Sequence, residues 1–277
     1  MSRITLGLAL LSAVLLPACG ARGPDVIYLP SASDVVTRML EVARVGPDDV
    51  VYDLGCGDGR IVIAAARDRG ARGVCVDIDP ARVADSRRNA DSAGVANRIE
   101  FRQGDMFETD LRSATVVALY LSPALNVRLR PKLFREVRPG AWIVSHNFPM
   151  GDWRPYTIFR VVWPAGTTSS VQAWQLPADV AGTWELVVAG AEGERRVRLR
   201  LTQQYQQVSG TASEEGRTLR LEGARLAGDS LEFQLSSRSG APAERLRFAG
   251  RARGAEMTGR VRSDPDSAGE RWRATRP

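Results

Sequence analysis

Three glycines at alternate positions follow an apolar run and precede a helix-like run, in the segment Asp53-Leu54-Gly55-Cys56-Gly57-Asp58-Gly59. Because glycine has no β-carbon, the backbone of such a loop can turn sharply and approach a bound molecule closely. Arg60 comes next, so the spacing is GxGxG and does not fit the GxGxxG fingerprint of dinucleotide sites. The loop therefore predicts a cofactor site that is not built for nicotinamide or flavin dinucleotides.

Acidic residues end three successive strand-like runs near this loop. Asp53 precedes the glycines, where a carboxylate would repel a pyrophosphate but suits a ligand with an ammonium group. Asp77, about 20 residues beyond Gly55, can accept hydrogen bonds from both hydroxyls of a ribose. Asp105 can accept one from an adenine amino group, beside the backbone of Met106. Helix caps or turns would explain any one of these aspartates. The three aspartates together with the glycine loop predict S-adenosylmethionine (SAM) as the cofactor.

Two later strand-like runs end in residues that could meet a methyl acceptor. His146 is the only histidine and can take a proton near neutral pH, although it can equally hydrogen-bond a loop. Tyr120, Asp152 and Trp153 are weaker candidates, and a structural role is the alternative for each of them. Methyl transfer from a sulfonium is an in-line displacement in which the protein mainly aligns the acceptor, so no general base is required.

Other chemistries are disfavoured. A single histidine makes a zinc site improbable, and we expect no metal. The chain has no Gly-x-Ser-x-Gly segment, which argues against Ser-His-Asp catalysis. Cys56 and Cys75 are interpreted as small buried residues, and we expect no disulfide.

The elements that must position these residues alternate regularly. A helix beginning at Ser31 or Ser33 ends at Gly46-Pro47. Strand-like and helix-like runs follow in turn, at 50–54, 60–69, 73–77, 80–93, 99–103, 115–121, 124–137 and 141–146. This alternation predicts βαβ units and a parallel sheet, which brings the three aspartates to one edge. Runs at 156–163 and 169–176 predict a hairpin that adds an antiparallel strand.

From about residue 179 the pattern changes to short β-type runs separated by glycine-bearing turns. We predict seven strands, at 183–189, 196–203, 218–222, 230–236, 246–250, 257–262 and 271–275. They suggest a meander that closes into a small barrel, with a sandwich as the alternative. The predicted domains are therefore 31–177, an α/β domain, and 178–277, a small all-β domain.

The first residues predict an export signal. Arg3 precedes an apolar run, 4–16, that is too short to span a bilayer comfortably, and the following segment 16–20 resembles a bacterial lipoprotein signal with Cys19 as the lipid-bearing residue. We therefore expect 1–19 to be a signal, 20–30 a linker and the protein a membrane-associated bacterial lipoprotein. An uncleaved membrane anchor is the alternative.

The net charge of +6 comes from arginine, since Lys132 is the only lysine. Dividing the chain at residue 178 leaves the same surplus of basic residues on both sides, so no basic face can be inferred. We expect no nucleic-acid partner.

Residues 28–153 resemble a class I SAM-dependent methyltransferase. The segment 53–62 is close to the loop of the lysine methyltransferases that modify the c subunit of the mitochondrial ATP synthase. The Tyr28-Leu29-Pro30-Ser31 segment is similar as well. The resemblance implies a doubly wound, Rossmann-like sheet. It implies that Asp53, Gly55 and Gly57 line the methionine moiety, Asp77 the ribose, and Asp105 with Met106 the adenine.

The implied activity is methyl transfer from SAM to a nucleophile, such as an amine of a protein or of a small molecule. The chain departs from that group in Cys56, where serine is usual, and in its C-terminal β domain. Because SAM is made in the cytoplasm, an exported protein would meet little of it. The alternative is therefore a non-catalytic envelope lipoprotein whose β domain binds a ligand or partner, although the intact site carboxylates argue against it.

Overall fold

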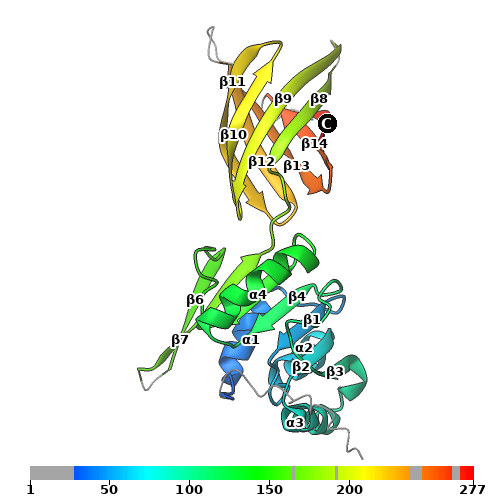
Figure 1. The fold of residues 1–277 in the computed structure, drawn as a ribbon, viewed down its shortest axis with the longest axis vertical. Helices are drawn as coiled ribbons and strands as arrows, with labels where there is room; N and C mark the ends of the chain where they lie inside the picture. The colour runs from blue at the N-terminus through cyan, green and yellow to red at the C-terminus, as the bar shows by residue number, and fades with distance from the viewer. Residues whose placement is uncertain (1–27, 164–165, 191–192, 238–244, 264–268) are drawn as a thin grey trace, which may run out of the picture.

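The computed structural model describes residues 28–163, 166–190, 193–237, 245–263 and 269–277. An α/β part with one seven-stranded sheet is followed by a closed, eight-stranded antiparallel barrel. Figure 1 shows the barrel at one end of the α/β part. The predicted fold class is confirmed, and of the two β architectures considered the barrel is correct.

The sheet has the order β3-β2-β1-β4-β5-β7-β6. Its parallel strands are β1 (Val50–Leu54), β2 (Arg72–Asp77), β3 (Ile99–Gln103), β4 (Val116–Leu119) and β5 (Trp142–His146). The order reverses between β1 and β4. In open α/β sheets the crevice beyond the carboxyl ends of the strands at such a reversal is where ligands bind.

The predicted hairpin is present and carries the antiparallel pairing. β6 (Thr157–Val162) pairs with β7 (Thr168–Gln175), and β7 runs antiparallel to β5. Residues 164 and 165, in the predicted turn between them, lie outside the described residues.

Helices cover both faces of the sheet, because alternate residues of each buried strand point to opposite sides. The helices are α1 (Ser33–Val42), α2 (Arg60–Arg69), α3 (Pro80–Ser92) and α4 (Pro123–Glu136), with a short 3-10 turn η1 (Ala96–Arg98). From β1, Tyr52 packs in the same cluster as Leu129 of α4, whereas Val51 packs in the cluster of α1 and α2. Each fully buried leucine of this kind contributes about 2 kcal/mol of transfer free energy.

The barrel strands follow one another around the wall and close between the last and the first. They are β8 (Gly182–Gly190), β9 (Gly193–Gln204), β10 (Gln207–Glu214), β11 (Arg217–Ala227), β12 (Ser230–Ser237), β13 (Arg245–Arg253), β14 (Glu256–Arg262) and β15 (Glu270–Thr275). Trp184, Phe233, Phe248 and Trp272 are buried together in one cluster. The barrel interior is thus a packed core rather than a ligand cavity.

β10 has no recognisable strand pattern in the sequence, so the predicted count of seven barrel strands was wrong. This segment, Gln-Val-Ser-Gly-Thr-Ala-Ser-Glu, is polar and buries only Ala212, which leaves little apolar alternation to recognise. It forms a strand because it pairs with β9 on one side and β11 on the other. Gly210 packs directly against the backbone of Arg200, a contact that a β-carbon would block.

The barrel contacts the amino-terminal edge of the sheet. The Ala178 N–H donates to the Gly228 carbonyl over 2.8 Å, and Gly228 packs against Gly140, which lies just before β5. Tyr205 donates to Asp152 over 2.9 Å, and the Trp153 indole donates to Gln206 over 2.9 Å. Asp152 and Trp153 therefore serve the interface between the two parts, which favours the structural role over acceptor contact for both residues.

The predicted signal segment 1–19, its Cys19 and most of the linker lie outside the described residues. In the part of the chain that the structure describes, no helix is long and apolar enough to cross a membrane.

Candidate functional site

A cavity of about 560 Å³ opens at the carboxyl-terminal edge of the sheet, at the reversal of strand order. Its wall comes from the ends of β1, β2 and β4, from the loop after β3 and from residues 28–31. Five of the six residues predicted to bind the cofactor line it, namely Asp53, Gly55, Asp77, Asp105 and Met106. The sixth, Gly57, lies behind the wall with its backbone N–H bonded to Asp77. The structure thus brings the predicted residues together, while their individual roles stay predictions.

The glycine loop has the backbone conformation that requires glycine. Gly55, Gly57 and Gly59 have φ angles of 80°, 55° and 78°, in the left-handed region that side chains disfavour. A β-carbon on Gly55 would lie 3.0 Å from Leu121, and one on Gly57 would overlap the Tyr28 ring. Substitution would therefore cost both backbone strain and a clash.

Asp77 shapes this loop from the end of β2. One carboxylate oxygen accepts the Gly57 N–H over 2.9 Å, and the other accepts the Asp79 N–H over 3.0 Å. Each oxygen keeps a second lone pair. Asp77 can therefore hold the loop and still accept hydrogen bonds from a ligand in the cavity.

Asp53 is a buried carboxylate, 2% exposed, to which no described residue donates a hydrogen bond. Burial raises the pKa of Asp53 to about 8, and the nearby Asp77 and Asp58 contribute to the rise. Such a group lacks a positive partner. The Asp53 carboxyl therefore fits a ligand that brings a cation, such as the ammonium of the SAM methionine moiety.

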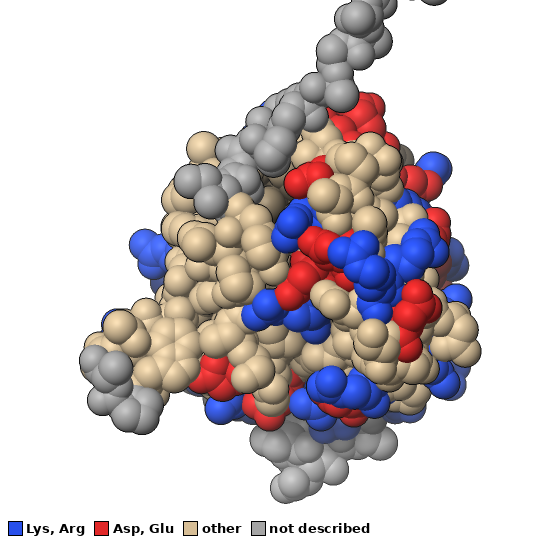
Figure 2. All heavy atoms as spheres, turned by 90° about the horizontal axis from the view of Figure 1, so that it is seen from below, with Lys and Arg blue, Asp and Glu red and all other residues tan. Residues whose placement is uncertain are grey.

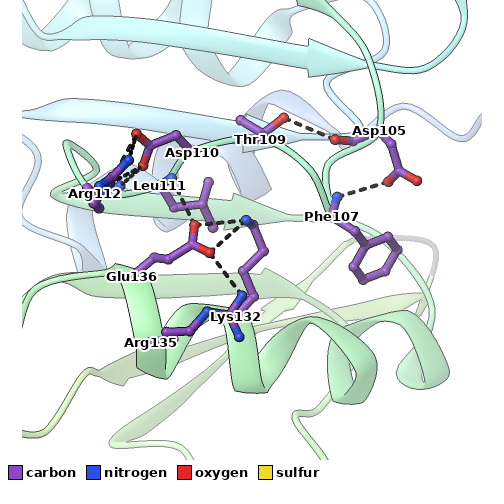
Figure 3. Close-up of polar contacts among 9 residues, drawn as sticks. All are labelled: Asp105, Phe107, Thr109, Asp110, Leu111, Arg112, Lys132, Arg135 and Glu136. Carbon is purple, nitrogen blue, oxygen red and sulfur yellow. Dashed lines mark hydrogen bonds and ion pairs between the residues drawn. The ribbon is translucent and has the colours of Figure 1, made fainter.

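Asp105 and Met106 belong to the loop after β3, which α4 holds in place (Figure 3). Asp105 accepts the Phe107 N–H over 2.9 Å. Further along, Glu136 of α4 accepts the Leu111 N–H over 3.3 Å and pairs with Lys132 at 2.8 Å. Burial by itself raises the pKa of Glu136, but hydrogen bonds from Lys132, Arg135 and Leu111 outweigh it and lower that pKa.

Residues 28–31 run over the mouth of the cavity. The Tyr28 ring lies against Gly57 and under the guanidinium of Arg82, at 4.9 Å. Arg60 donates to the Ser31 carbonyl over 2.6 Å and pairs with Asp58 at 2.5 Å. Arg60 and Arg82 were not predicted to line the cavity, because neither stands in a sequence pattern that marks a ligand contact.

Tyr120 lines the cavity, whereas His146 lies behind it. His146 is 4% exposed, with Nδ1 2.9 Å from the Ser31 hydroxyl and Nε2 3.0 Å from the Ser169 hydroxyl. The Tyr120 ring stacks on it at 3.9 Å between centroids. Burial lowers the pKa of His146 to about 4, against a small opposing effect of Asp34. Of the two roles considered for His146, the geometry favours hydrogen bonding that positions Ser31 and Tyr120.

Cys56 and Cys75 form a disulfide, so the expectation of two unpaired thiols was wrong. Both residues are buried as predicted, at 5% and 0% exposure. The loop bends back onto β2, where the N–H groups of Gly55 and Cys56 donate to the Val76 carbonyl over 2.8 and 3.1 Å. This return of the chain brings the two cysteines together.

The cavity wall is rich in carboxylates. Five aspartates line it, Asp53, Asp58, Asp77, Asp79 and Asp105, against two arginines, Arg60 and Arg82. Figure 2, which views the molecule from the end opposite the barrel, shows acidic and basic side chains interleaved across this face. Within the described ranges, no group of three or more histidine, cysteine or acidic side chains is arranged to hold a metal ion.

Comparison with known proteins gives consistent matches to the α/β part. The family model described as the ANTKMT methyltransferase domain matches residues 53–157. A protein-lysine N-methyltransferase of Saccharolobus islandicus is 44% identical over 139 residues, covering 50% of this chain and 86% of that protein. The adenine nucleotide translocase lysine N-methyltransferase of Mus musculus is 32% identical, covering 48% of this chain and 58% of that protein.

A solved structure adds a second kind of relative. The crystal structure of an RNA methyltransferase from Salinibacter ruber, in complex with S-adenosyl-L-homocysteine, is 51% identical with a TM-score of 0.51. The match covers 55% of this chain and 96% of that one.

Proposed function

Since this chain belongs to the class I SAM-dependent methyltransferases related to the protein-lysine and adenine nucleotide translocase lysine N-methyltransferases, we propose that its acceptor is a lysine side chain of a protein. The chain is a SAM-dependent methyltransferase, and the non-catalytic alternative is set aside. The reaction and the cofactor follow from the family, whereas the identity of the methyl acceptor is our proposal.

The site supports this activity with residues that bind and orient. When bound, SAM supplies a methyl group activated by a sulfonium. We expect Asp53 to pair with the ammonium of the methionine moiety, Asp77 to accept from the ribose, and Asp105 with the Met106 backbone to bind the adenine. Tyr120 lines the cavity with its ring stacked on His146, and we expect it to contact the acceptor.

The charge of the cavity wall is the observation that carries the choice of acceptor. With five aspartates against two arginines, the wall stays acidic after a cationic cofactor binds. An acidic cavity wall attracts an ammonium group and repels phosphates, as Coulomb's law requires. The Saccharolobus islandicus relative, described as a protein-lysine N-methyltransferase, supports the same choice.

RNA is the second candidate, because the Salinibacter ruber relative is described as an RNA methyltransferase. The acidic wall disfavours it, since an RNA acceptor would bring several phosphates close to the mouth. The two candidates make different predictions about which polymer gains the methyl group.

The test is transfer of a labelled methyl group from SAM to a bacterial lysate. With the wild-type enzyme we expect label in lysate protein, located on lysine by mass spectrometry. With the Asp77→Ala variant as the enzyme we expect no label. An equal amount of nuclease-treated lysate should be labelled to the same extent. Label that nuclease treatment removes would show an RNA acceptor and reject the proposal.

We further propose that the protein is a lipoprotein attached to the membrane through Cys19, on the basis of residues 3–20. Palmitate labelling of whole cells should mark the wild-type chain and not Cys19→Ala. An unlabelled wild-type chain in the cytoplasmic fraction would reject this attachment.

A further inference from the structure

One face of the barrel is covered by arginine. The outward positions of β13, β14 and β15 are exposed, while Phe248, Met257 and Trp272 between them point into the core. These strands carry eight outward arginines. Arg245 and Arg253 lie at the two ends of β13, and strand pairing sets the other six in a grid: Arg247, Arg251, Arg260, Arg262, Arg271 and Arg273. This face is not visible from composition, because the charge of the β domain is only slightly positive overall.

Within the grid like charges oppose one another. Arg247 pairs in register with Arg262, and Arg260 with Arg271. Like charges directly opposite on a sheet destabilise it. These opposed arginines lower the folding stability of the free protein. An anionic partner would relieve the repulsion between them.

Carboxylates compensate the grid only in part. Arg251 pairs with Asp229 at 2.9 Å, and Arg273 with Glu256 at 2.8 Å. Arg247, Arg262 and Arg271 have no carboxylate partner among the described residues. By contrast, three exposed arginines of β9 and β11 each pair with a glutamate, as Arg196–Glu194, Arg198–Glu185 and Arg220–Glu222.

We propose that this arginine face docks on the surface of a membrane that contains anionic phospholipid. The grid extends in two dimensions over three strands, which matches a field of headgroups better than a single line of phosphates. Its other outward residues, such as Ala249 and Thr258, are small, so no aromatic side chain there could stack on a nucleic-acid base. The inference is independent of the acceptor and of the site at the far edge of the sheet.

The experiment measures binding to sedimented vesicles of phosphatidylcholine with about 30% phosphatidylglycerol, an anionic fraction that gives a surface potential of tens of millivolts, or of phosphatidylcholine alone. All proteins are full-length and carry Leu8→Asp, Leu11→Asp, Leu15→Asp and Cys19→Ser, so that the apolar N-terminus does not dominate binding. This background should bind anionic vesicles only, and less at high salt.

The test variant adds Arg247→Gln, Arg262→Gln and Arg271→Gln; the control adds Arg196→Gln, Arg198→Gln and Arg220→Gln. Both lose three charges, but we expect only the test variant to bind about 100-fold more weakly. Its thermal unfolding midpoint should be unchanged or higher, because repulsion is relieved. Equal losses in both variants, or no preference of the background for anionic vesicles, would overturn the proposal. Specific binding of single-stranded RNA to the same face, without vesicle binding, would overturn it in favour of RNA.

Discussion

Two buried side chains at the site have ionisation states that their surroundings control. Asp53 lies at the end of β1 among other carboxylates, and burial raises its pKa to about 8. His146 lies between two serine hydroxyls, and burial lowers its pKa to about 4. Near neutral pH the ligand-free site therefore holds Asp53 mostly protonated and His146 neutral.

The raised pKa of Asp53 predicts that SAM binding depends on pH. A cationic ligand favours the ionised carboxylate, so binding releases a proton, and affinity should rise up to about tenfold per pH unit between pH 6 and 7.5. Isothermal titration calorimetry of wild type and Asp53→Asn measures it. The variant should bind weakly and with a flat pH dependence; a wild-type affinity that does not change over this range would contradict the assignment.

The same raised pKa affects the ligand-free protein. A carboxyl that binds its proton more tightly when folded contributes stability at low pH that is lost as the pH rises from about 4 towards 8. Asp53→Asn should remove this part of the pH dependence of unfolding.

The contribution of His146 to folding stability changes with pH in the opposite direction. Its folded pKa lies below the unfolded value, so its stability contribution is present above about pH 6.5 and is lost as the pH falls towards 4. Between pH 7 and pH 5 the free energy of unfolding should fall by about 2 kcal/mol on this account. Urea unfolding of His146→Gln should lack that loss. An inflection of kcat near pH 6.5 that disappears in the variant would instead indicate general-base catalysis.

At the scale of elements, the glycine loop is held by its neighbours on several sides. Asp77 accepts its backbone N–H at Gly57, Tyr28 packs on it, and the disulfide ties Cys56 to Cys75 of β2. The loop after β3 is held in the same way by Glu136 of α4. All of these contacts lie within the protein, so they can hold both loops without a contribution from the ligand, which reduces the entropy lost on binding.

Reduction of the disulfide should loosen the loop. It closes a segment with a sequence separation of 19 residues, so opening it should lower the free energy of unfolding by about 3 kcal/mol in the chain-entropy account. Affinity for S-adenosylhomocysteine should fall with it. Calorimetry with and without reductant measures this, and the Cys56→Ser/Cys75→Ser protein, which cannot respond to reductant, is the control. Free thiols at Cys56 and Cys75 in the untreated native protein would contradict the bond.

At the scale of the whole molecule, the barrel lies at one end of the α/β part (Figure 1), and the cavity opens at the opposite edge of the sheet. The barrel meets Gly140 and the 152–154 segment, while the cavity lies beyond the ends of β1, β2 and β4. No residue beyond Leu125 lines the cavity within the described ranges. The barrel therefore does not cover the mouth of the cavity.

This separation predicts that the interface can be weakened without loss of cofactor binding. Tyr205→Ala/Gln206→Ala removes the bonds to Asp152, Trp153 and the Arg154 carbonyl, and leaves the buried Trp153 indole without its acceptor, at about 1–3 kcal/mol. Calorimetric unfolding should divide into two transitions, while S-adenosylhomocysteine affinity stays within about twofold. Arg196→Ala, exposed on β9, is the control. A large loss of affinity would show coupling between barrel and cavity.

The sequence alone determined the α/β part and the position of its site. The alternation of strand-like and helix-like runs specified parallel pairing, and parallel strands bring Asp53, Asp77 and Asp105 to one edge. The glycines of the loop reported a backbone conformation directly, because few other residues adopt it. These features are local or follow from one topological rule, and one sequence is enough to recognise them.

Only the tertiary structure decided the features that depend on distant segments meeting. The Cys56–Cys75 bond needs the loop to bend back onto β2, and the polar strand β10 exists because its two neighbours need a strand to close the barrel. His146 is buried because Ser31 and Ser169 reach it from both sides, and the arginine face forms through the register of three strands. Register and closure arise from packing between distant residues, which local periodicity does not encode.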